Sequence, residues 1–350
     1  MPPLTPRPRA ALMMATGLED VVLDGGARTR LEAVVDLVSP TCDGVNDAVF
    51  PLLKFGNRTS STPSDLPADV EILVTGWGCP ALDADALAGL PVLRLVAHAA
   101  GTVRPLATEA LWARDVTVTS AAAANAIPVA EFAFAAIVMI AKDVFGIRNR
   151  HRAVRGREPV VDHARMGTRG RRIGLVGAST IGRLVIERLR TLDVDVVVSD
   201  PFLDEEEAVA LGVGLLELEE LLSTSDVVSL HAPLLDSTRR MVGADQLARM
   251  PDGAWLLNTA RGGLVDTEAL TAEVATGRLR AFLDTPDPEP LPPDSSLYDL
   301  EGAVLTPHIA GSLGSEVSRM GDLAVTEVER FVAGEPPLHP VVRSDLDHIA

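Results

Sequence analysis

The feature that most constrains the fold of this chain is a glycine-rich turn between a predicted strand and a predicted helix. The turn reads Gly177-Ala178-Ser179-Thr180-Ile181-Gly182; it follows the apolar strand Ile173–Val176 and opens the helix Ile181–Thr191. Glycine at both ends allows a tight bend and close helix packing, and the helix N-terminus offers unpaired N–H groups to a pyrophosphate. Ser179 stands where a glycine is typical, so the turn alone fits a dinucleotide site and an ordinary strand–helix turn equally well.

An acidic residue at the end of the next strand favours the dinucleotide interpretation. Asp200 follows Gly182 by 18 residues and ends the strand Val194–Ser199, where a carboxylate accepts hydrogen bonds from ribose hydroxyls. Pro201 and Phe202 come next, so no arginine stands there to receive a 2′-phosphate. These residues predict NAD rather than NADP as the cofactor. The alternative for Asp200 is a cap at the strand end.

Strands and helices alternate along the whole chain, which predicts parallel sheets covered by helices. The strands of a doubly wound nucleotide-binding domain are predicted at Ile173–Val176, Val194–Ser199, Val227–His231, Ala254–Asn258, Ala281–Asp284 and Ala303–Thr306. An earlier alternation has strands at Ala10–Ala15, Val70–Thr75, Val92–His98 and Val116–Thr119. A long helix capped by Asn125 leads from one alternation to the other, and a helix over 315–331 is expected to return to the first domain. We therefore expect a discontinuous domain of residues 1–124 and 313–350 around a domain of residues 125–312.

Composition excludes several classes of function. The chain has 350 residues, 47% of them hydrophobic, which fits two domains with sizeable cores. A net charge of −18 disfavours nucleic acid and anionic membranes as partners. The apolar stretch Phe132–Ala141 is shorter than the roughly 20 residues of a membrane span and predicts a buried helix. Cys42 and Cys79 give no disulfide framework. We expect a cytoplasmic protein without a metal site.

Three polar residues beyond the nucleotide turn predict chemistry on a 2-keto acid. Arg261 follows a predicted strand and precedes two glycines, and its guanidinium can grip a carboxylate through two hydrogen bonds. His308 also follows a strand, and an imidazole passes protons near neutral pH. Glu289 lies in a proline-rich loop, where its carboxylate would orient the imidazole and raise its pKa. Taken singly, each residue has a structural alternative. It is a surface ion pair for Arg261, a structural histidine for His308 and a rigid surface loop for Glu289.

These residues carry a family resemblance that covers nearly the whole chain. The sequence resembles the D-isomer-specific 2-hydroxyacid dehydrogenases, which include glyoxylate/hydroxypyruvate reductases and phosphoglycerate dehydrogenases. The matching motifs are Leu175–Arg183, Val227–Pro233, Leu256–Asp266, Ala281–Pro292 and Leu305–Ser312, with a weaker match over Val96–Glu131. The resemblance implies an α/β fold with two Rossmann-like domains: a doubly wound NAD-binding domain and a smaller flavodoxin-like substrate domain. It also implies hydride transfer between NAD(H) and a small 2-hydroxy or 2-keto acid, with D specificity.

The resemblance implies a role for each matching position. His308 is expected to be the acid in reduction and the base in oxidation, with Glu289 as its partner and Arg261 on the substrate carboxylate. Asp284 is expected at the nicotinamide end of the cofactor. The expected cofactor contacts are Gly177, Ser179, Thr180, Ile181, Gly182, Asp200, Ala232, Thr259, Ala260, Arg261, Asp284, His308, Ala310 and Gly311. Backbone N–H groups of Ala100, Gly101 and Thr102 are expected to bind the substrate carboxylate together with Arg261.

Departures from the family pattern leave the substrate open. The substrate loop reads Ala100-Gly101-Thr102-Val103-Arg104, where the family usually has Gly-x-Gly followed by Val-Asp. Arg104 is either a solvated side chain or a ligand of a second anionic group on the substrate. Lys54 and Trp77 are further candidates for the pocket wall, with surface exposure and core packing as their alternatives. No regulatory C-terminal domain of the kind found in some phosphoglycerate dehydrogenases is expected after His308.

Other functions remain open from the same residues. The chain also resembles NAD-sensing corepressors, which share the fold and the Arg/Glu/His set without significant turnover. A phosphite oxidoreductase keeps the three residues as well, whereas a formate dehydrogenase is expected to have an amide where Glu289 stands. The arginine-rich stretch 148–172 is an alternative nucleic-acid arm, but it lacks aromatic residues that stack on bases. The resemblance places this stretch near a subunit interface, and a homodimer is expected.

Overall fold

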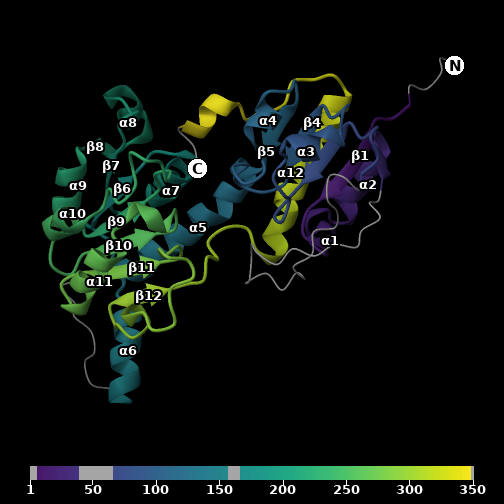
Figure 1. Ribbon diagram of the computed structural model, residues 1–350. Helices are drawn as coiled ribbons and strands as arrows, with labels where there is room; N and C mark the ends of the chain where they lie inside the picture. The colour runs from purple at the N-terminus through teal and green to yellow at the C-terminus, as the bar shows by residue number, and fades with distance from the viewer. Residues whose placement is uncertain (1–5, 39–65, 157–165, 348–350) are drawn as a thin grey trace. The chain divides into compact units, whose positions relative to one another are not determined.

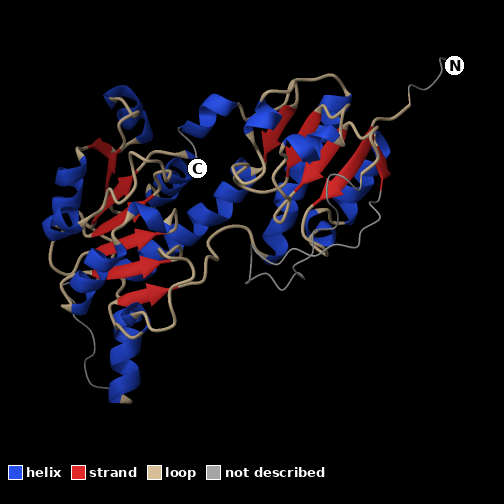
Figure 2. Cartoon of the chain, in the orientation of Figure 1, coloured by secondary structure: helices blue, strands red, loops and turns tan. Residues whose placement is uncertain are grey.

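The chain folds into two compact α/β units. The computed structural model describes residues 6–38, 66–156 and 166–347 (Figure 1). One unit comprises Met1–Asn125 and Ser312–Ala350, and the other comprises Ala126–Gly311. These boundaries lie one residue from the expected ones, and the first unit is discontinuous in sequence. Strands of each unit form a sheet with helices beside it (Figure 2).

The first unit contains a five-stranded parallel sheet in the order β2-β1-β3-β4-β5. Its strands are β1 Arg9–Met13, β2 Asp36–Val38, β3 Ile72–Thr75, β4 Leu95–His98 and β5 Thr117–Ser120. Its helices are α1 Glu19–Val22, α2 Gly25–Val34, α3 Ala84–Ala88, α4 Glu109–Trp112 and α12 Val317–Val332. Every residue of β3 and β4 is buried, as expected of parallel strands covered on both faces. This strand order is the flavodoxin-like one, so the predicted class of the smaller domain is confirmed.

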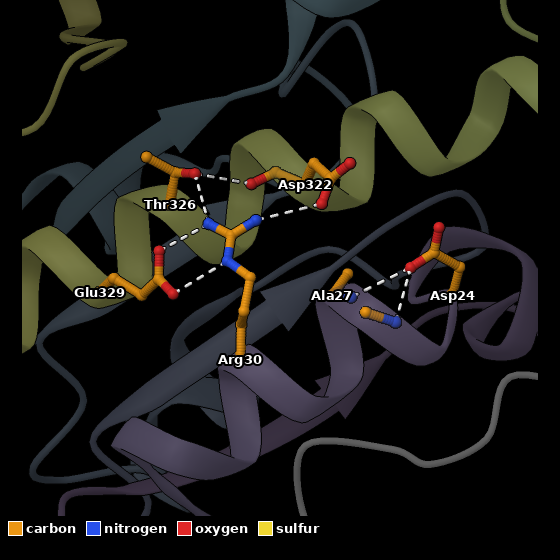
Figure 3. A network of polar contacts seen from close by, with 7 residues as sticks. Asp24, Ala27, Arg30, Asp322, Thr326 and Glu329 are labelled. Carbon is orange, nitrogen blue, oxygen red and sulfur yellow. Dashed lines mark hydrogen bonds and ion pairs between the residues drawn. The ribbon is translucent and has the colours of Figure 1, made fainter.

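An arginine network joins the two chain segments of the first unit. Arg30 on α2 donates from Nε to Oε1 of Glu329 at 3.0 Å and from NH2 to Oε2 at 2.6 Å, a bidentate arrangement. The same guanidinium contacts Asp322 at 3.1 Å and Thr326 at 2.8 Å, all on α12 (Figure 3). The Glu329 carboxylate is the main reason that the pKa of Arg30 lies above its ordinary value. The network lies beside the buried apolar face of α12, which carries Val317, Met320 and Val325.

The second unit contains a seven-stranded parallel sheet in the order β12-β11-β10-β9-β6-β7-β8. Its strands are β6 Arg172–Val176, β7 Asp195–Ser199, β8 Gly214–Leu215, β9 Val227–Leu230, β10 Trp255–Asn258, β11 Arg280–Leu283 and β12 Ala303–Leu305. Strands β7 and β8 lie on one side of β6, and strands β9 to β12 lie on the other. The direction of the strand order therefore reverses between β6 and β9, which is the doubly wound topology of a nucleotide-binding domain.

Side-chain caps begin three helices of the second unit. Its helices are α6 Val144–Val154, α7 Thr180–Leu189, α8 Glu205–Leu211, α9 Leu218–Thr224, α10 Ala244–Arg249 and α11 Thr267–Ala275. Ser179, Asp204 and Asp266 each accept a hydrogen bond from a backbone N–H in the first turn of α7, α8 and α11. The sequence analysis predicted neither α8 nor β8, the short strand that precedes α9. The acidic start of α8 shows little apolar periodicity, and a two-residue strand shows none.

The long helix α5, Ala122–Ala141, carries the chain from the first unit into the second. The predicted N-cap at Asn125 is wrong, because the helix begins three residues earlier and the Ser120 hydroxyl accepts from the N–H of Ala122 at 3.0 Å. Asn125 instead accepts from the N–H of Ser312 at 2.9 Å. Among the described residues, α5 alone has the length and hydropathy of a membrane span, and half of that window is buried. Ile137 belongs to the core of the second unit, and Phe132 packs against it.

Among the described residues, each unit has one buried histidine, and each of these is bonded to a hydroxyl. His98 Nδ1 lies 2.9 Å from Thr75 Oγ1 in the first unit, and His231 Nε2 lies 2.9 Å from Ser229 Oγ in the second. The two side chains are buried, with 4% and 5% of each residue exposed. Burial is the main cause that lowers both pKa values from 6.5 to about 4.

We therefore expect acid to destabilise both units well above the pH at which carboxylates titrate. The folded protein keeps each imidazole neutral, while the unfolded chain binds a proton below its ordinary pKa of about 6.5. Stability is thus fully present above that pH and is lost as the pH falls toward 4. Between about pH 7 and about pH 5 the loss is about 2 kcal/mol for each histidine. Urea unfolding at both pH values measures it, and His231→Leu should remove about 2 kcal/mol of the loss. An equal loss in this variant and in the wild type would contradict the assignment.

Candidate active site

The predicted site residues of the second unit follow the carboxyl ends of neighbouring strands. Because all seven strands are parallel, these ends lie at one edge of the sheet. In sheet order, the predicted residues that follow β12, β11, β10, β9, β6 and β7 are His308, Asp284 and Glu289, Arg261, Ala232, Gly177 and Asp200. In open α/β sheets, ligands bind where the strand order reverses, which in this sheet is between β6 and β9. Gly177 and Asp200, predicted for one half of the cofactor, lie on one side of this point. Asp284, predicted for the nicotinamide end, lies on the other side.

The nucleotide turn requires glycine at both of its ends. Gly177 has φ +101°, and a Cβ there would lie 2.8 Å from the backbone N of Ala232, across the reversal point. A Cβ on Gly182 would lie 2.2 Å from the carbonyl oxygen of Gly177. Real Cβ atoms do not approach backbone so closely, so α7 packs this tightly only with glycine at its third position. The turn holds the helix N-terminus directly over the ends of β6 and β9.

Ser179 has a role that the sequence analysis did not identify. Its hydroxyl accepts from the N–H of Gly182 at 3.3 Å as the N-cap of α7, and it donates to the carbonyl of His231 at 2.9 Å. The hydroxyl therefore ties the nucleotide turn to the end of β9. The backbone N–H groups of Thr180 and Ile181, at the start of α7, make no hydrogen bond within the described part of the chain. They remain available to an anionic group at the helix N-terminus.

Asp200 braces the turn from the neighbouring strand. One carboxylate oxygen accepts from the N–H of Ala178 at 2.6 Å, and the other accepts from the N–H of Phe202 at 2.8 Å. The residue thus caps its own strand end, as the structural alternative supposed, and also links β7 to the nucleotide turn. Each carboxylate oxygen has a second lone pair for a further donor. The side chain lies where a ribose contact is predicted, next to the exposed Phe202.

The loop after β10 is built around a buried asparagine. Asn258, 1% exposed, accepts from the N–H of Ala260 at 3.0 Å and donates to the carbonyl of Arg261 at 2.8 Å. The Arg261 guanidinium donates from NH1 to the carbonyl of Ala260 at 2.7 Å. A Cβ on Gly262 would lie 2.2 Å from the carbonyl oxygen of Pro286, so this glycine allows the Arg261 loop to contact the loop that leads to Glu289. The sequence analysis did not select Asn258, although an asparagine at a strand end commonly bonds the following turn.

Asp284 holds the loop that carries His308. Its carboxylate accepts from the Thr306 hydroxyl at 2.6 Å and from the N–H groups of Ile309 at 2.8 Å and Ala310 at 2.9 Å. Its own carbonyl accepts from the N–H of His308 at 2.9 Å. Asp284 is fully buried, so the structure assigns its carboxylate to this loop. The predicted contact with the nicotinamide end of the cofactor stays a prediction.

His308 and Glu289 form the predicted pair. The imidazole Nδ1 lies 2.7 Å from Glu289 Oε1, a hydrogen bond between loops after β12 and β11. Both side chains are partly open to solvent, at 36% and 43%. His308 adopts φ 55°, a left-handed conformation that few residues with side chains adopt, and the bonds to Asp284 hold it there. Since Nδ1 faces the carboxylate, Nε2 is left to exchange a proton with a ligand.

A match to a family model decides which family this chain belongs to. The model of the D-isomer specific 2-hydroxyacid dehydrogenase NAD binding domain matches residues 134–310, which is more than half of the chain. The chain belongs to the D-isomer-specific 2-hydroxyacid dehydrogenase family.

Individual relatives agree with this membership. An (S)-sulfolactate dehydrogenase of Chromohalobacter salexigens is 36% identical over 71% of this chain and 81% of its own length. A glyoxylate reductase of Korarchaeum cryptofilum is 35% identical over 73% of this chain and 78% of its own length. The crystal structure of the TT0316 protein from Thermus thermophilus superposes with a TM-score of 0.74 at 30% identity, covering 95% of this chain and all of that one.

The substrate loop predicted for this dehydrogenase lies in the first unit. Ala100, Gly101 and Thr102 follow β4, and their three N–H groups make no hydrogen bond within the described residues. Arg104 donates to the carbonyl of Leu346 near the C-terminus, so its guanidinium is not simply solvated. Trp77 is partly buried against the core of the first unit, as its core-packing alternative supposed. Lys54 and Cys42 lie outside the described residues.

Two observations show that the dehydrogenase's nucleotide-binding unit fits a dinucleotide. The turn at Gly177–Gly182 leaves no room for a Cβ at either glycine and leaves the first N–H groups of α7 unbonded. The hydroxyl of Thr259, after β10, is buried and has no hydrogen-bond partner within the described part of the chain, which is costly unless a ligand completes it. In the same residues no cluster of three or more His, Cys, Asp or Glu side chains is arranged to hold a metal ion.

Proposed function

We propose that this protein transfers a hydride between NAD(H) and a small 2-keto or 2-hydroxy acid, producing or consuming the D-configured hydroxy acid. The observation that carries the proposal is the His308 Nδ1–Glu289 Oε1 bond of 2.7 Å at the sheet edge that also presents Arg261 and the nucleotide turn. Family membership supports the same conclusion. A guanidinium, an acid–base pair and a dinucleotide turn on one edge are the parts that reversible carbonyl reduction needs.

Each side chain then has a definite task. The NAD(H) nicotinamide, when bound, supplies or accepts the hydride. Arg261 binds the substrate carboxylate through its planar fork and polarises the neighbouring carbonyl. His308 donates a proton from Nε2 to the carbonyl oxygen during reduction and removes it during oxidation. Glu289 keeps the ring oriented through its bond to Nδ1. The N–H groups of Ala100, Gly101 and Thr102 add hydrogen bonds to the substrate carboxylate.

The cofactor preference proposed is NAD over NADP. The Asp200 carboxylate at the end of β7 would accept from a ribose hydroxyl but would repel a phosphate at the same position. No arginine or lysine occupies residues 201–203. Gly177, Ser179, Thr180, Ile181 and Gly182 would surround the pyrophosphate, while the remaining contacts predicted from the sequence are Ala232, Thr259, Ala260, Ala310 and Gly311.

The test is consumption of NADH with a panel of 2-keto acids, including glyoxylate, hydroxypyruvate, pyruvate and sulfopyruvate. We expect saturable turnover with at least one of them, and weaker turnover with NADPH. A second assay with phosphite and NAD tests the alternative that the protein is a phosphite oxidoreductase. If NADH binds but no acid turns over, an NAD-sensing scaffold is the better conclusion.

A homodimer is part of the proposal. Helix α6 has no buried residue within the chain, and Val144 and Val154 at its two ends are each 41% exposed. Phe145 in its first turn packs on the core of the second unit, whereas residues 151–154 are exposed. A helix with so much exposed surface is stabilised when a second copy covers it. The cytoplasm remains the compartment proposed for the enzyme, because an NAD(H) cofactor and the free thiol of Cys79 fit it.

A further inference from the structure

The C-terminal segment 338–341 pairs with β5, the strand that ends the sheet order of the first unit. The N–H of Val341 donates to the carbonyl of Val118 at 2.8 Å, and the N–H of Ser120 donates to the carbonyl of His339 at 3.2 Å. An isolated antiparallel bridge lies between these two bonds. The segment therefore covers the edge of the sheet beside β5.

A buried glutamate of α12 anchors this segment. Glu327 is 1% exposed, and its carboxylate accepts from the N–H of Leu338 at 3.0 Å and from the N–H of His339 at 2.7 Å. A buried carboxylate needs such donors, because an ionised group without them is costly to bury. The bonds of His339 come from its backbone and do not depend on its side chain. The place of the segment beside β5 therefore depends on Glu327.

Ser120 connects the C-terminal segment to the predicted substrate loop. Its backbone N–H bonds the carbonyl of His339, as described above. Its hydroxyl donates to the carbonyl of Gly101 at 2.7 Å and accepts from the N–H of Ala122 at 3.0 Å. The residue is 6% exposed, so these bonds form in the interior of the unit. Ser120 is thus held through its backbone by the segment, while its side chain holds the loop.

Bonds to the carbonyls of this loop set the directions of its N–H groups. In a planar trans peptide, the C=O of one residue and the N–H of the next point in opposite directions. The Ser120 hydroxyl on the carbonyl of Gly101 therefore orients the N–H of Thr102. The N–H of Ala121 makes one of its two bonds to the carbonyl of Ala100, at 3.1 Å, and so orients the N–H of Gly101. Two of the three N–H groups predicted to bind the substrate carboxylate are oriented in this way.

The last residues of the described chain contact the same loop a second time. Arg104 donates to the carbonyl of Leu346. Val103, 2% exposed, belongs to the same apolar core cluster as Val341, and Leu346 packs against that cluster. The C-terminal residues thus support the loop 100–104 through apolar packing as well as through hydrogen bonds.

We propose that Ser120 and Glu327 are positioning residues for the substrate, and that the C-terminal segment links them. Ser120 acts through the peptide between Gly101 and Thr102, and Glu327 acts through the segment that holds Ser120. The proposal rests on the proposed function for the identity of the anion, which is the carboxylate of a small 2-keto acid. Substrate affinity then depends on the C-terminal segment.

Three variants separate positioning from ordinary stability. Ser120→Ala removes the hydroxyl and keeps the backbone N–H that bonds His339. Glu327→Gln keeps one acceptor oxygen and loses the charge. Ser225→Ala is the matched control, because Ser225 is a buried serine of the second unit whose hydroxyl donates to the carbonyl of Leu221 at 2.7 Å. The control loses the same kind of bond, at the same distance, outside the substrate loop.

The kinetic experiment measures KM for the best keto acid, kcat and NADH affinity. We expect Ser120→Ala to raise KM about fivefold, the effect of one lost hydrogen bond, and Glu327→Gln to raise it about threefold. In both variants kcat and NADH affinity should stay within about twofold, because the carboxylate is bound equally in the ground state and the transition state. Ser225→Ala should leave KM within about twofold.

Two structural measurements accompany the kinetics. Hydrogen exchange over residues 336–342 should be faster in Glu327→Gln, because this variant weakens the bonds to Leu338 and His339, and unchanged in Ser120→Ala. In crystal structures, the peptide between Gly101 and Thr102 should leave its wild-type direction in Ser120→Ala and keep it in Ser225→Ala.

The outcomes are distinguishable from failure of the proposed function. An unchanged KM or an unchanged peptide direction in Ser120→Ala would overturn the proposal, as would an equal rise of KM in Ser225→Ala. Unchanged KM and exchange in Glu327→Gln would contradict the role of the C-terminal segment. If Ser120→Ala does not fold, the comparison of Glu327→Gln with Ser225→Ala decides. If the wild type turns over no keto acid, the proposed function fails, and the peptide direction in the crystal structures then decides whether Ser120 holds the loop.

Discussion

Replacing His308 by alanine should lower kcat for the best keto acid about 100- to 10,000-fold while NADH affinity stays within about twofold. The reason is that Nδ1 is committed to Glu289 at 2.7 Å, which leaves Nε2 as the proton donor to the carbonyl oxygen. Alanine removes the proton donor but leaves the nucleotide turn and Asp200 in place. Steady-state turnover and fluorescence titration with NADH measure the two quantities separately.

Two further variants sharpen this expectation. Glu289→Gln keeps a hydrogen-bonding side chain but removes the charge that orients and stabilises the imidazole, so its kcat should fall less than that of His308→Ala. His339→Asn is the control, because His339 is a partly exposed histidine of the first unit that is outside the predicted site. A His308→Ala enzyme that retains more than about a third of wild-type kcat, or that loses NADH affinity as much as kcat, would contradict the assigned role.

Replacing Arg261 by lysine should lower kcat/KM for the keto acid about 100-fold. Lysine keeps the positive charge, but a single ammonium group cannot offer two parallel hydrogen bonds to a carboxylate. In the wild type, Arg261 NH1 also donates to the carbonyl of Ala260 at 2.7 Å. A lysine at this position would have to share one ammonium group between that carbonyl and the substrate carboxylate. Most of the loss should appear in KM, since the carboxylate is bound in the ground state as well as in the transition state.

The control for this variant is Arg249→Lys, at an exposed position in the last turn of α10. It should leave kcat/KM within about twofold, as ordinary surface substitutions do. Initial rates over a range of keto-acid concentrations, at saturating NADH, give both constants. Equal kinetics for the Arg261→Lys and Arg249→Lys enzymes would remove Arg261 from the substrate site.

Much of the fold and the positions of the reactive residues could be predicted because they depend on local sequence. Apolar runs such as 255–258 end in polar residues, and parallel strands bring those ends to one edge. The nucleotide turn could also be predicted, because its glycines at 177 and 182 and the helix that it opens are close together in the sequence. The same logic failed where local sequence is ambiguous: Asn125 is a good N-cap by type, yet α5 begins at Ala122, whose N–H donates to the Ser120 hydroxyl.

The supporting contacts could not be predicted because they join residues far apart in sequence. Asp284 holds the His308 loop through atoms 22 to 26 residues away, and His98 pairs with Thr75 across 23 residues. Such pairs depend on strand register and on loop geometry, neither of which a single stretch of sequence specifies. Ser179 was recognised from the sequence, but its role was not. Because it replaces the usual glycine, it weakened the match to the dinucleotide motif. In the structure its hydroxyl caps α7 and donates to the carbonyl of His231.

The most direct test of hydride transfer at this site is the fate of a label. The keto-acid panel is repeated with NADH in which both hydrogens at C4 of the nicotinamide are replaced by deuterium, and the hydroxy-acid product is examined for label and configuration. The account predicts deuterium on C2 of a D-configured hydroxy acid with the wild type, and little product with His308→Ala. NADH that binds but is never consumed with any acid of the panel, or a product without deuterium at C2, would contradict it.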